Sequence, residues 1–391
     1  MSVVAAADDK VESVNRETKH KIGLVLSGGG ARGAYQSGVL KAVTEITRKM
    51  GIRRPLPIIT GVSAGAINAS YLAATADDLV VGAQQMADIW SKITADQIFR
   101  TDALSAGRSG LRLLTDATIG AFYKRKLSRS LLDTAPLRDF LLKTIPFERI
   151  SSNVESGFLT ALGLTAMSYS ESNSITFVHG RTNQEMWTRS RRKSERAAIT
   201  AEHVMASSAI PLFFPPIRLA SEDFGDGCLR NTAPLSPAIH LGAEKLLVIS
   251  VRKADSGGPS KTATIEPSFA RVLGVILNAL LLDAIDVDME RMSRINSTIS
   301  MIPAVHLQEM KLRPVEYLWL RPSEDIGELA GDLFERLPKV IRYLVGGLGS
   351  SREASELTSY LLFDPDFCGQ LVSLGYRDGY AQREAIEEFF Q

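Results

Sequence analysis

Cysteine is scarce in this sequence of 391 residues, which contains only Cys228 and Cys368. Two cysteines cannot form a disulfide framework, so we interpret both as small, buried apolar residues and expect a reducing compartment. Long apolar runs are also missing. The longest, residues 272–282, is broken by Gly274 and Asn278 and is shorter than the ~18 residues typical of a membrane-spanning helix. The sequence therefore predicts no disulfide framework and no transmembrane helix.

Patterns for metal or nucleic-acid binding are absent as well. The net charge of +1 gives no overall attraction to nucleic acid, and neither cluster of basic residues carries a nucleic-acid motif. No histidine is spaced with a second histidine or a cysteine as in a zinc site. We therefore expect no metal, no cofactor and no nucleic-acid partner. The five histidines are His20, His179, His203, His240 and His306.

The first twenty residues are polar, and acidic residues stand where a signal peptide needs a basic start and an apolar stretch. We expect residues 1–20 to be a disordered leader and the protein to be cytoplasmic.

One short motif, GVSAG at residues 61–65, stands out against these absences. It follows an apolar run at residues 56–59 and leads into a helical pattern, as a nucleophile elbow does. Gly61 and Gly65 would let strand and helix approach closely, while the turn exposes the hydroxyl of Ser63 above a helix N-terminus. Taken alone the motif is equally consistent with an ordinary turn between a strand and a helix.

A glycine-rich loop, SGGGARG at residues 27–33, lies between the strand at 21–26 and a helix at about 34–48. Its Gly28, Gly30 and Gly33 match a dinucleotide-binding pattern. That function also needs an acidic residue at the end of the next strand, which here ends in TGVS instead. The other interpretation is an oxyanion hole, because glycines leave their amides unshielded at a helix N-terminus.

Arg32 stands in the first turn of that helix, where the helix dipole disfavours a cation. The position suggests a function, such as attracting an anionic substrate or orienting the loop. A surface ion pair is the alternative.

Residues 76–150 are mainly helical in pattern, and residues 92–129 contain eight Lys or Arg against three Asp. With Phe99, Phe122 and Tyr123 this stretch is typical either of a lid or membrane-docking surface, or of a solvated helical face. A second basic cluster comprises Arg189, Arg191, Arg192, Lys193 and Arg196.

Strands are predicted at residues 158–169 and 175–179, and a helix at 197–207. The apolar, proline-rich loop 210–216 contains Phe213 and Phe214, which suit either a pocket wall or core packing. Asp226 and Gly227 then form a pattern that is locally most typical of a turn.

The remaining chain returns to the sheet at residues 246–251 and continues through a Gly/Ser-rich link at 256–260. A long helix is predicted over residues 269–292, followed by a short strand at 317–320 and helices from 326 onward.

A serine hydrolase of the Ser-Asp-His type would need a histidine after its acid, and His240 lies 14 residues beyond Asp226. It falls in a helix predicted at 234–241, away from the loop position usual for such a base. Two mechanisms stay open: a triad with His240, or a dyad in which Asp226 serves alone.

Together, GGGARG at 28–33, GVSAG at 61–65, ASSAIPLFFPP at 206–216 and DG at 226–227 resemble the patatin-like phospholipases in content, order and spacing. The resemblance covers roughly residues 21–251. It implies a three-layer α/β/α fold with a mostly parallel sheet. Residues 21–255 would be the catalytic domain, with a helical insert at about 76–150, and residues 265–391 a mainly helical C-terminal region.

The resemblance also implies a lipid acyl hydrolase that cleaves phospholipid or lysophospholipid esters without a catalytic histidine, in peripheral association with a membrane surface. Ser63 would be the nucleophile and Asp226 the base. The amides of Gly28, Gly29 and Gly30, beside Arg32, would form the oxyanion hole, and Phe213 and Phe214 would contact the acyl chain. Cys228 departs from the family pattern of Asp-Gly-Gly or Asp-Gly-Ala, although a small side chain still fits there.

Overall fold

The structure is a computed structural model that describes residues 19–101, 130–254, 266, 268–303, 306, 313–347 and 349–391. Most of the expected leader, Phe122 and Tyr123, most of the first basic stretch and the Gly/Ser-rich link lie outside the described residues.

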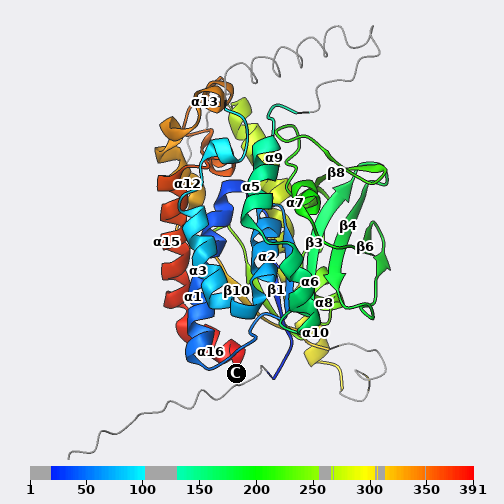
Figure 1. Cartoon of the computed structure of the whole chain (residues 1–391). Helices are drawn as coiled ribbons and strands as arrows, with labels where there is room; N and C mark the ends of the chain where they lie inside the picture. The colour runs from blue at the N-terminus through cyan, green and yellow to red at the C-terminus, as the bar shows by residue number, and fades with distance from the viewer. Residues whose placement is uncertain are drawn as a thin grey trace, which may run out of the picture.

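A mixed β-sheet forms the middle layer of the molecule (Figure 1). Its strand order in the described part of the chain is β10-β9-β1-β2-β3-β4-β6-β5, and β8 pairs with both β3 and β7. The strands from β10 to β3 are parallel, whereas β3 pairs antiparallel with β4 and β8. The bounds are β1 (Ile22–Leu26), β2 (Ile58–Val62), β3 (Ala161–Ser168), β4 (Asn173–Gly180), β5 (Thr188–Arg189), β6 (Arg192–Arg196), β7 (Ile217–Leu219), β8 (Glu222–Asp226), β9 (Lys245–Ile249) and β10 (Glu316–Leu320).

Successive apolar side chains of the central strands pack alternately into two cores, one on each face of the sheet. Leu24 of β1 points into the larger core and Val25 into the smaller one. Because successive strand residues face opposite sides, a strand that is apolar throughout must be covered on both faces. The expected three-layer α/β fold is thus confirmed.

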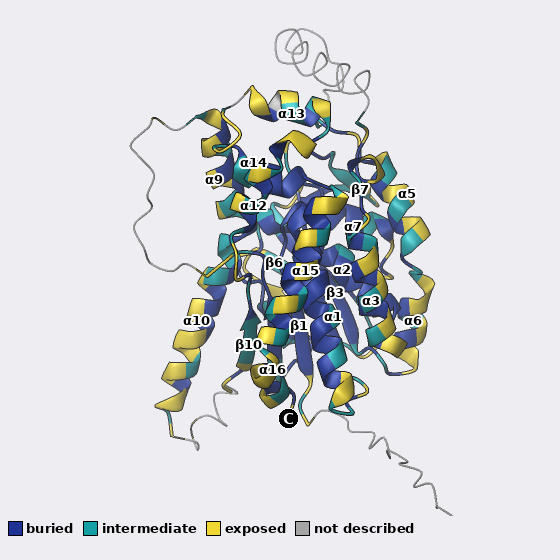
Figure 2. Cartoon of the chain, turned by 90° about the vertical axis from the view of Figure 1, so that its left-hand side faces the viewer, coloured by how far each residue is buried: buried dark blue, intermediate teal, exposed yellow. Residues whose placement is uncertain are grey.

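The larger core lies under the helices that follow the first two strands and under the last helices of the chain. In Figure 2 the helices that follow the first two strands are almost wholly dark blue, whereas the last helices of the chain are dark blue toward the sheet and yellow toward solvent. Helix α15 packs along α1, so the end of the chain lies against its beginning. The layer comprises α1 (Gly33–Lys49), α2 (Ala64–Ala74), α3 (Leu79–Trp90), α5 (Ala135–Thr144), α6 (Glu148–Glu155), α12 (Ile326–Asp332), α14 (Ser355–Leu361), α15 (Pro365–Ala381) and α16 (Arg383–Phe390).

The opposite face of the sheet carries α8 (Ser236–His240) and α10 (Asp283–Ser300). Helix α7 (Ala201–Ser207) packs on β3, and α13 (Lys339–Gly346) ends near the top of Figure 1.

The single helix expected over residues 269–292 is instead two helices, α9 (Phe269–Leu281) and α10, which meet at Leu282. The acidic side chains of Asp283 and Asp286 stand in the first turn of α10, where the helix dipole favours negative charge. None of the helices within the described ranges is long and apolar enough to cross a membrane.

Candidate active site

Ser63 stands at a strained turn between the buried strand β2 and helix α2. Its backbone has φ 56° and ψ −129°, a conformation that non-glycine residues rarely adopt. A Cβ atom on Gly61 would lie 2.2 Å from the carbonyl oxygen of Gly65, so the turn leaves no room for a side chain there. The motif therefore forms the close strand-to-helix turn that its glycines predicted.

Asp226 reaches Ser63 from the end of β8. Ser63 Oγ donates a hydrogen bond of 2.6 Å to Asp226 Oδ2. The other carboxylate oxygen, Oδ1, accepts a 2.9 Å bond from the amide of Cys228. Both carboxylate oxygens are thus held, and one of them points at the serine hydroxyl.

The Asp226 carboxyl group is fully buried, and this changes its acidity. Burial raises its pKa to about 6, although the hydrogen bonds from Ser63 and Cys228 act in the opposite direction. A carboxylate with a pKa near 6 is a better proton acceptor than one near 4 and is still mostly ionised at pH 7.

Two serines at the end of α7 brace the turn around Ser63, and the sequence did not single them out. Ser207 Oγ accepts a bond from the Ser63 amide at 3.0 Å and donates to the carbonyl of Thr165. Ser208 Oγ donates to the Ser63 carbonyl at 3.0 Å. Their only sequence signal was their position in the block ASSAIPLFFPP, directly before the apolar loop.

The glycine-rich loop lies directly beside Ser63. A Cβ atom on Gly28 would lie 2.9 Å from Ser63 Cβ and 2.6 Å from Cys228 Sγ. Gly30 lines the cavity next to Ser63. Within the described residues, the amides of Gly29 and Gly30 have no hydrogen-bond acceptor. The loop therefore brings unpaired N–H groups close to the serine, as an oxyanion hole requires.

The side chain of Arg32 points to a different part of the molecule. It is 3% exposed and forms bonds to Glu356 and Ser359 of α14. It thus forms a buried ion pair with the C-terminal region, which differs from both the substrate-facing cation and the surface ion pair considered above.

Apolar side chains line the cavity at Ser63. Phe214 belongs to this lining, whereas Phe213 is buried in the core beside it and is not part of the wall. Ile210 comes from the same apolar loop, whereas the other apolar wall residues come from segments far apart in the chain, so local patterns could not reveal them: Ala64, Ile67, Trp90, Ile98, Leu137 and Phe363.

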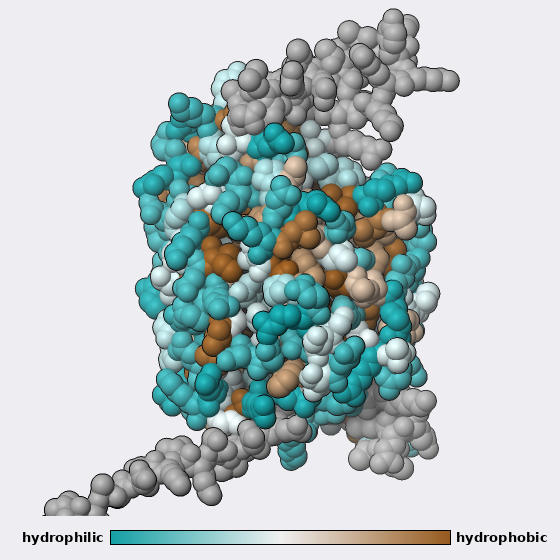
Figure 3. Space-filling view, in the orientation of Figure 1, coloured by the Kyte–Doolittle hydropathy of each residue, from teal (hydrophilic) through white to brown (hydrophobic). Residues whose placement is uncertain are grey.

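A second apolar cavity lies between α2, α3 and α5 and shares Ile67, Trp90 and Ile98 with the first. Figure 3 shows apolar side chains gathered in the middle of the face that these helices form. The two cavities therefore adjoin each other at these three shared residues.

Phe99 was expected to be exposed, in a lid or docking surface or on a solvated helical face, but it is buried in the core. Its ring packs against Phe214 and Phe363, each at 6.2 Å between ring centres. The second basic cluster forms the edge strands β5 and β6, where Lys193 pairs with Glu171 at 2.8 Å. Arg196 donates to three backbone carbonyls, so part of this cluster serves local structure.

His240 lies on α8 and makes contacts other than Ser63 and Asp226. Its ring stacks on Trp187 at 4.9 Å, and its Nδ1 lies 2.8 Å from the carbonyl oxygen of Ser236. Ser63 donates directly to Asp226, with no histidine between the two side chains. Among the described residues no group of acidic, His or Cys side chains could hold a metal ion.

Comparisons with known sequences find one family. A family model described as patatin-like phospholipase matches residues 24–239, more than half of the chain. A patatin-like phospholipase domain-containing protein of Caenorhabditis elegans is 42% identical over 82 residues, which are 19% of this chain and 6% of that protein.

Two solved structures are similar at low identity. VipD from Legionella pneumophila is 14% identical, with a TM-score of 0.31, and the match covers 91% of this chain and 67% of VipD. The type III effector protein ExoU is also 14% identical, with a TM-score of 0.33, and the match covers 88% of this chain and 53% of ExoU.

Proposed function

Because the chain belongs to the patatin-like phospholipase family, we propose that it is a lipid acyl hydrolase that cleaves carboxylic esters through an acyl-Ser63 intermediate. The observation that carries the proposal is the 2.6 Å hydrogen bond from Ser63 Oγ to Asp226 Oδ2, formed at a strained turn beside unpaired glycine amides. Nucleophile, base and oxyanion donors are the three parts that acyl transfer requires.

In the acylation step, the Ser63 hydroxyl transfers its proton to Asp226 while Oγ attacks the ester carbonyl carbon. The carbonyl oxygen becomes an oxyanion, which the amides of Gly29 and Gly30 stabilise. When the tetrahedral intermediate collapses, the C–O bond to the alcohol breaks and the alcohol takes the proton from Asp226. The acyl group is then bound to Ser63.

In the deacylation step, water takes the place of the alcohol. Asp226 accepts a proton from the water as its oxygen attacks the acyl carbon, and the proton passes to Ser63 when the fatty acid leaves. The raised pKa of Asp226 suits both proton transfers near neutral pH.

The apolar lining of the cavity supports an acyl chain as the bound part of the substrate. Apart from Gly30, Ser63 and Ser208, every residue around the Ser63 cavity is apolar. We propose phospholipid or lysophospholipid as substrate and peripheral association with membrane surfaces. Arg189 and Arg191, both exposed at the edge of the sheet, would supply part of the attraction to anionic lipid.

A hydrolysis panel tests the proposal. Wild type and Ser63→Ala are assayed on phospholipid, lysophospholipid and neutral-ester vesicles or micelles, and release of fatty acid is measured. We expect wild type to hydrolyse at least one lipid class and Ser63→Ala to hydrolyse none. Labelling by a fluorophosphonate probe should modify Ser63, identified by peptide mass.

A folded wild-type protein that neither hydrolyses any of these esters nor reacts with the probe would contradict the proposal. It would point instead to a lipid-binding protein that keeps the fold without the chemistry. Vesicle binding by the same preparation measures that alternative directly.

A further inference from the structure

Helix α14, which lies outside the residues that match the family, touches the glycine-rich loop directly. Gly30 has φ +56°, and a Cβ atom on it would lie 2.3 Å from the carbonyl oxygen of Tyr360. The backbone of α14 thus fills the space behind Gly30, and the loop position depends on where this helix lies.

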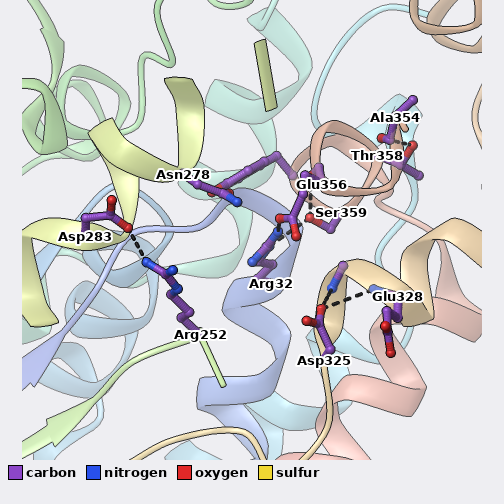
Figure 4. A network of polar contacts seen from close by, with 12 residues as sticks. Arg32, Arg252, Asn278, Asp283, Asp325, Glu328, Ala354, Glu356, Thr358 and Ser359 are labelled. Atoms are coloured by element: carbon purple, nitrogen blue, oxygen red, sulfur yellow. Dashed lines mark hydrogen bonds and ion pairs between the residues drawn. The ribbon is translucent and has the colours of Figure 1, made fainter. Parts of the chain in front are cut away.

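The contact is completed by Arg32, which follows the loop glycines in the short 3-10 helix Gly30–Arg32. Its Nε donates to Ser359 Oγ at 2.8 Å and its Nη2 to Glu356 Oε2 at 2.5 Å. The guanidinium also lies 4.6 Å from the ring centre of Tyr360. Three residues on little more than one turn of α14 therefore hold a single side chain, as Figure 4 shows for Glu356 and Ser359.

The opposite charges of Arg32 and Glu356 determine that these two side chains pair with each other. Burial disfavours an unpaired guanidinium strongly, so Arg32 requires a carboxylate close by. Burial opposes ionisation of Glu356 and is the largest single influence on its pKa. The charge of Arg32, the hydrogen bonds from Asn278 and Arg32 and the charge of Arg252 together outweigh it and hold the pKa of Glu356 below its ordinary value. Both partners are therefore charged at neutral pH, and the planar guanidinium fixes direction as well as distance.

Helix α14 is itself anchored on a second side. Tyr360 Oη donates to Asn278 Oδ1 of α9 at 2.7 Å. In the same network Arg252, just beyond β9, contacts Asp283 at the start of α10 (Figure 4). The helix also leads into Phe363, which lines the Ser63 cavity and stacks on Trp90 at 6.5 Å. Helix α14 and the residues directly after it thus contact both the glycine-rich loop and a wall of the Ser63 cavity.

We infer that Glu356 and Ser359 of α14 are positioning residues for acyl transfer. They hold Arg32, and through it the amides of Gly29 and Gly30, in the geometry that stabilises the oxyanion. The inference rests on the proposed function, and it assigns a catalytic contribution to the C-terminal region. A displacement of the donors by about 1 Å can lower a rate on the order of a hundredfold.

Two substitutions test this role. Glu356→Gln removes the charge at nearly constant size, and Ser359→Ala removes one acceptor of Arg32. The substrate is a short chromogenic ester, p-nitrophenyl butyrate, and active sites are titrated with a fluorophosphonate. We expect kcat per titrated site to fall about 10- to 100-fold for Glu356→Gln and less for Ser359→Ala, with KM changed less than about threefold. Glu356→Asp, which keeps the charge, should recover part of the loss.

Glu335→Gln is the matched control, because Glu335 forms an exposed ion pair with Arg342 at 2.7 Å. It should keep the wild-type kcat. A wild-type kcat per site in Glu356→Gln overturns the inference, and so does a loss confined to KM or to the number of titratable sites.

Hydrogen–deuterium exchange tests the positioning role even if the proposed function is wrong. If wild type has no esterase activity, the proposed function fails, but the loop can still be examined. Faster exchange of residues 27–33 in Glu356→Gln than in wild type and Glu335→Gln supports the positioning role. Unchanged exchange in that segment contradicts it.

Discussion

Ser63 Oγ lies 2.6 Å from Asp226 Oδ2, although 163 positions separate the two residues in the chain. The two meet because β2 and β8 both pair with β3, which brings the end of β8 to the turn after β2. The proposed nucleophile and its proposed base are thus held by the sheet itself, with no side chain between them.

The first prediction concerns the base. Asp226→Asn keeps the shape of the side chain but cannot accept the serine proton, so kcat should fall by about 10²- to 10⁴-fold. Stopped-flow or steady-state hydrolysis of a lipid ester measures this. The control is Asp223→Asn on the same strand, where Asp223 pairs with Arg218 at 3.3 Å, and it should keep near wild-type activity.

The pH dependence of the wild type follows from the same group. Because Asp226 acts as a base and burial raises its pKa to about 6, kcat/KM should rise with pH through about 6 and then level off. At pH 5 the rate should be about a tenth of the plateau, since one group in about ten is ionised. A profile that is flat between pH 5 and 7 would speak against Asp226 as the base.

The free energy of unfolding should change with pH in the direction opposite to kcat/KM. The pKa of Asp226 is higher in the folded protein than its ordinary value of 3.8, so the folded state binds more protons between pH 4 and 6. The free energy of unfolding therefore falls as pH rises through this window and stays lower above it. Asp226→Asn removes this cost and should be more stable than wild type at pH 7, by about 3 kcal/mol at most. Chemical denaturation at pH 4 and pH 7 measures it, and equal stability of both proteins at pH 7 would refute the prediction.

His240 provides the test between dyad and triad. Its ring stacks on Trp187 and contacts Ser236, so His240→Ala should leave kcat within about twofold of wild type. The loss of the aromatic contact should lower the free energy of unfolding by about 1 kcal/mol. A fall in kcat comparable to that of Ser63→Ala would instead establish the triad.

Chain-length selectivity should depend on the link between the two apolar cavities. Ile67 lines both cavities and is only partly buried. Ile67→Trp should therefore fill the space where the two cavities adjoin, without crowding the core. We expect kcat/KM for long-chain esters to fall about tenfold or more relative to acetyl esters. Ile89→Trp is the control, because Ile89 lines only the second cavity and should affect only the longest chains. An equal fall in kcat/KM for all chain lengths would show that long acyl chains do not extend into the second cavity.

Local sequence was sufficient to predict those parts of the structure that depend on residues close together in the chain. The strained turn at Ser63 could be predicted because Gly61 and Gly65 permit a close approach that other residues forbid. Apolar strands and helical periodicity likewise predicted the alternation of strands and helices, and the resemblance to the patatin-like phospholipases implied the three-layer α/β/α fold. The break at Leu282 was missed because an apolar, helical pattern continues across it, and the acidic residues beyond it were read as part of the same helix.

Side chains that act through distant partners could not be placed in the same way. Phe99 looked exposed because nothing near it in sequence reveals Phe214 and Phe363, which bury it. Arg32 was recognised as an unfavourable cation near a helix start, but its partner Glu356 lies 324 positions away.

The sequence by itself determined the tight turn at Ser63 and the glycine-rich loop, because both are specified by short-range backbone geometry, and the order of the four blocks carried the resemblance to the family. Only the tertiary structure decided that Asp226 is buried enough to have a pKa of about 6, and that α14 supports the loop. Burial and ion pairing depend on which distant segments the sheet and its helices bring together, and no local pattern encodes that.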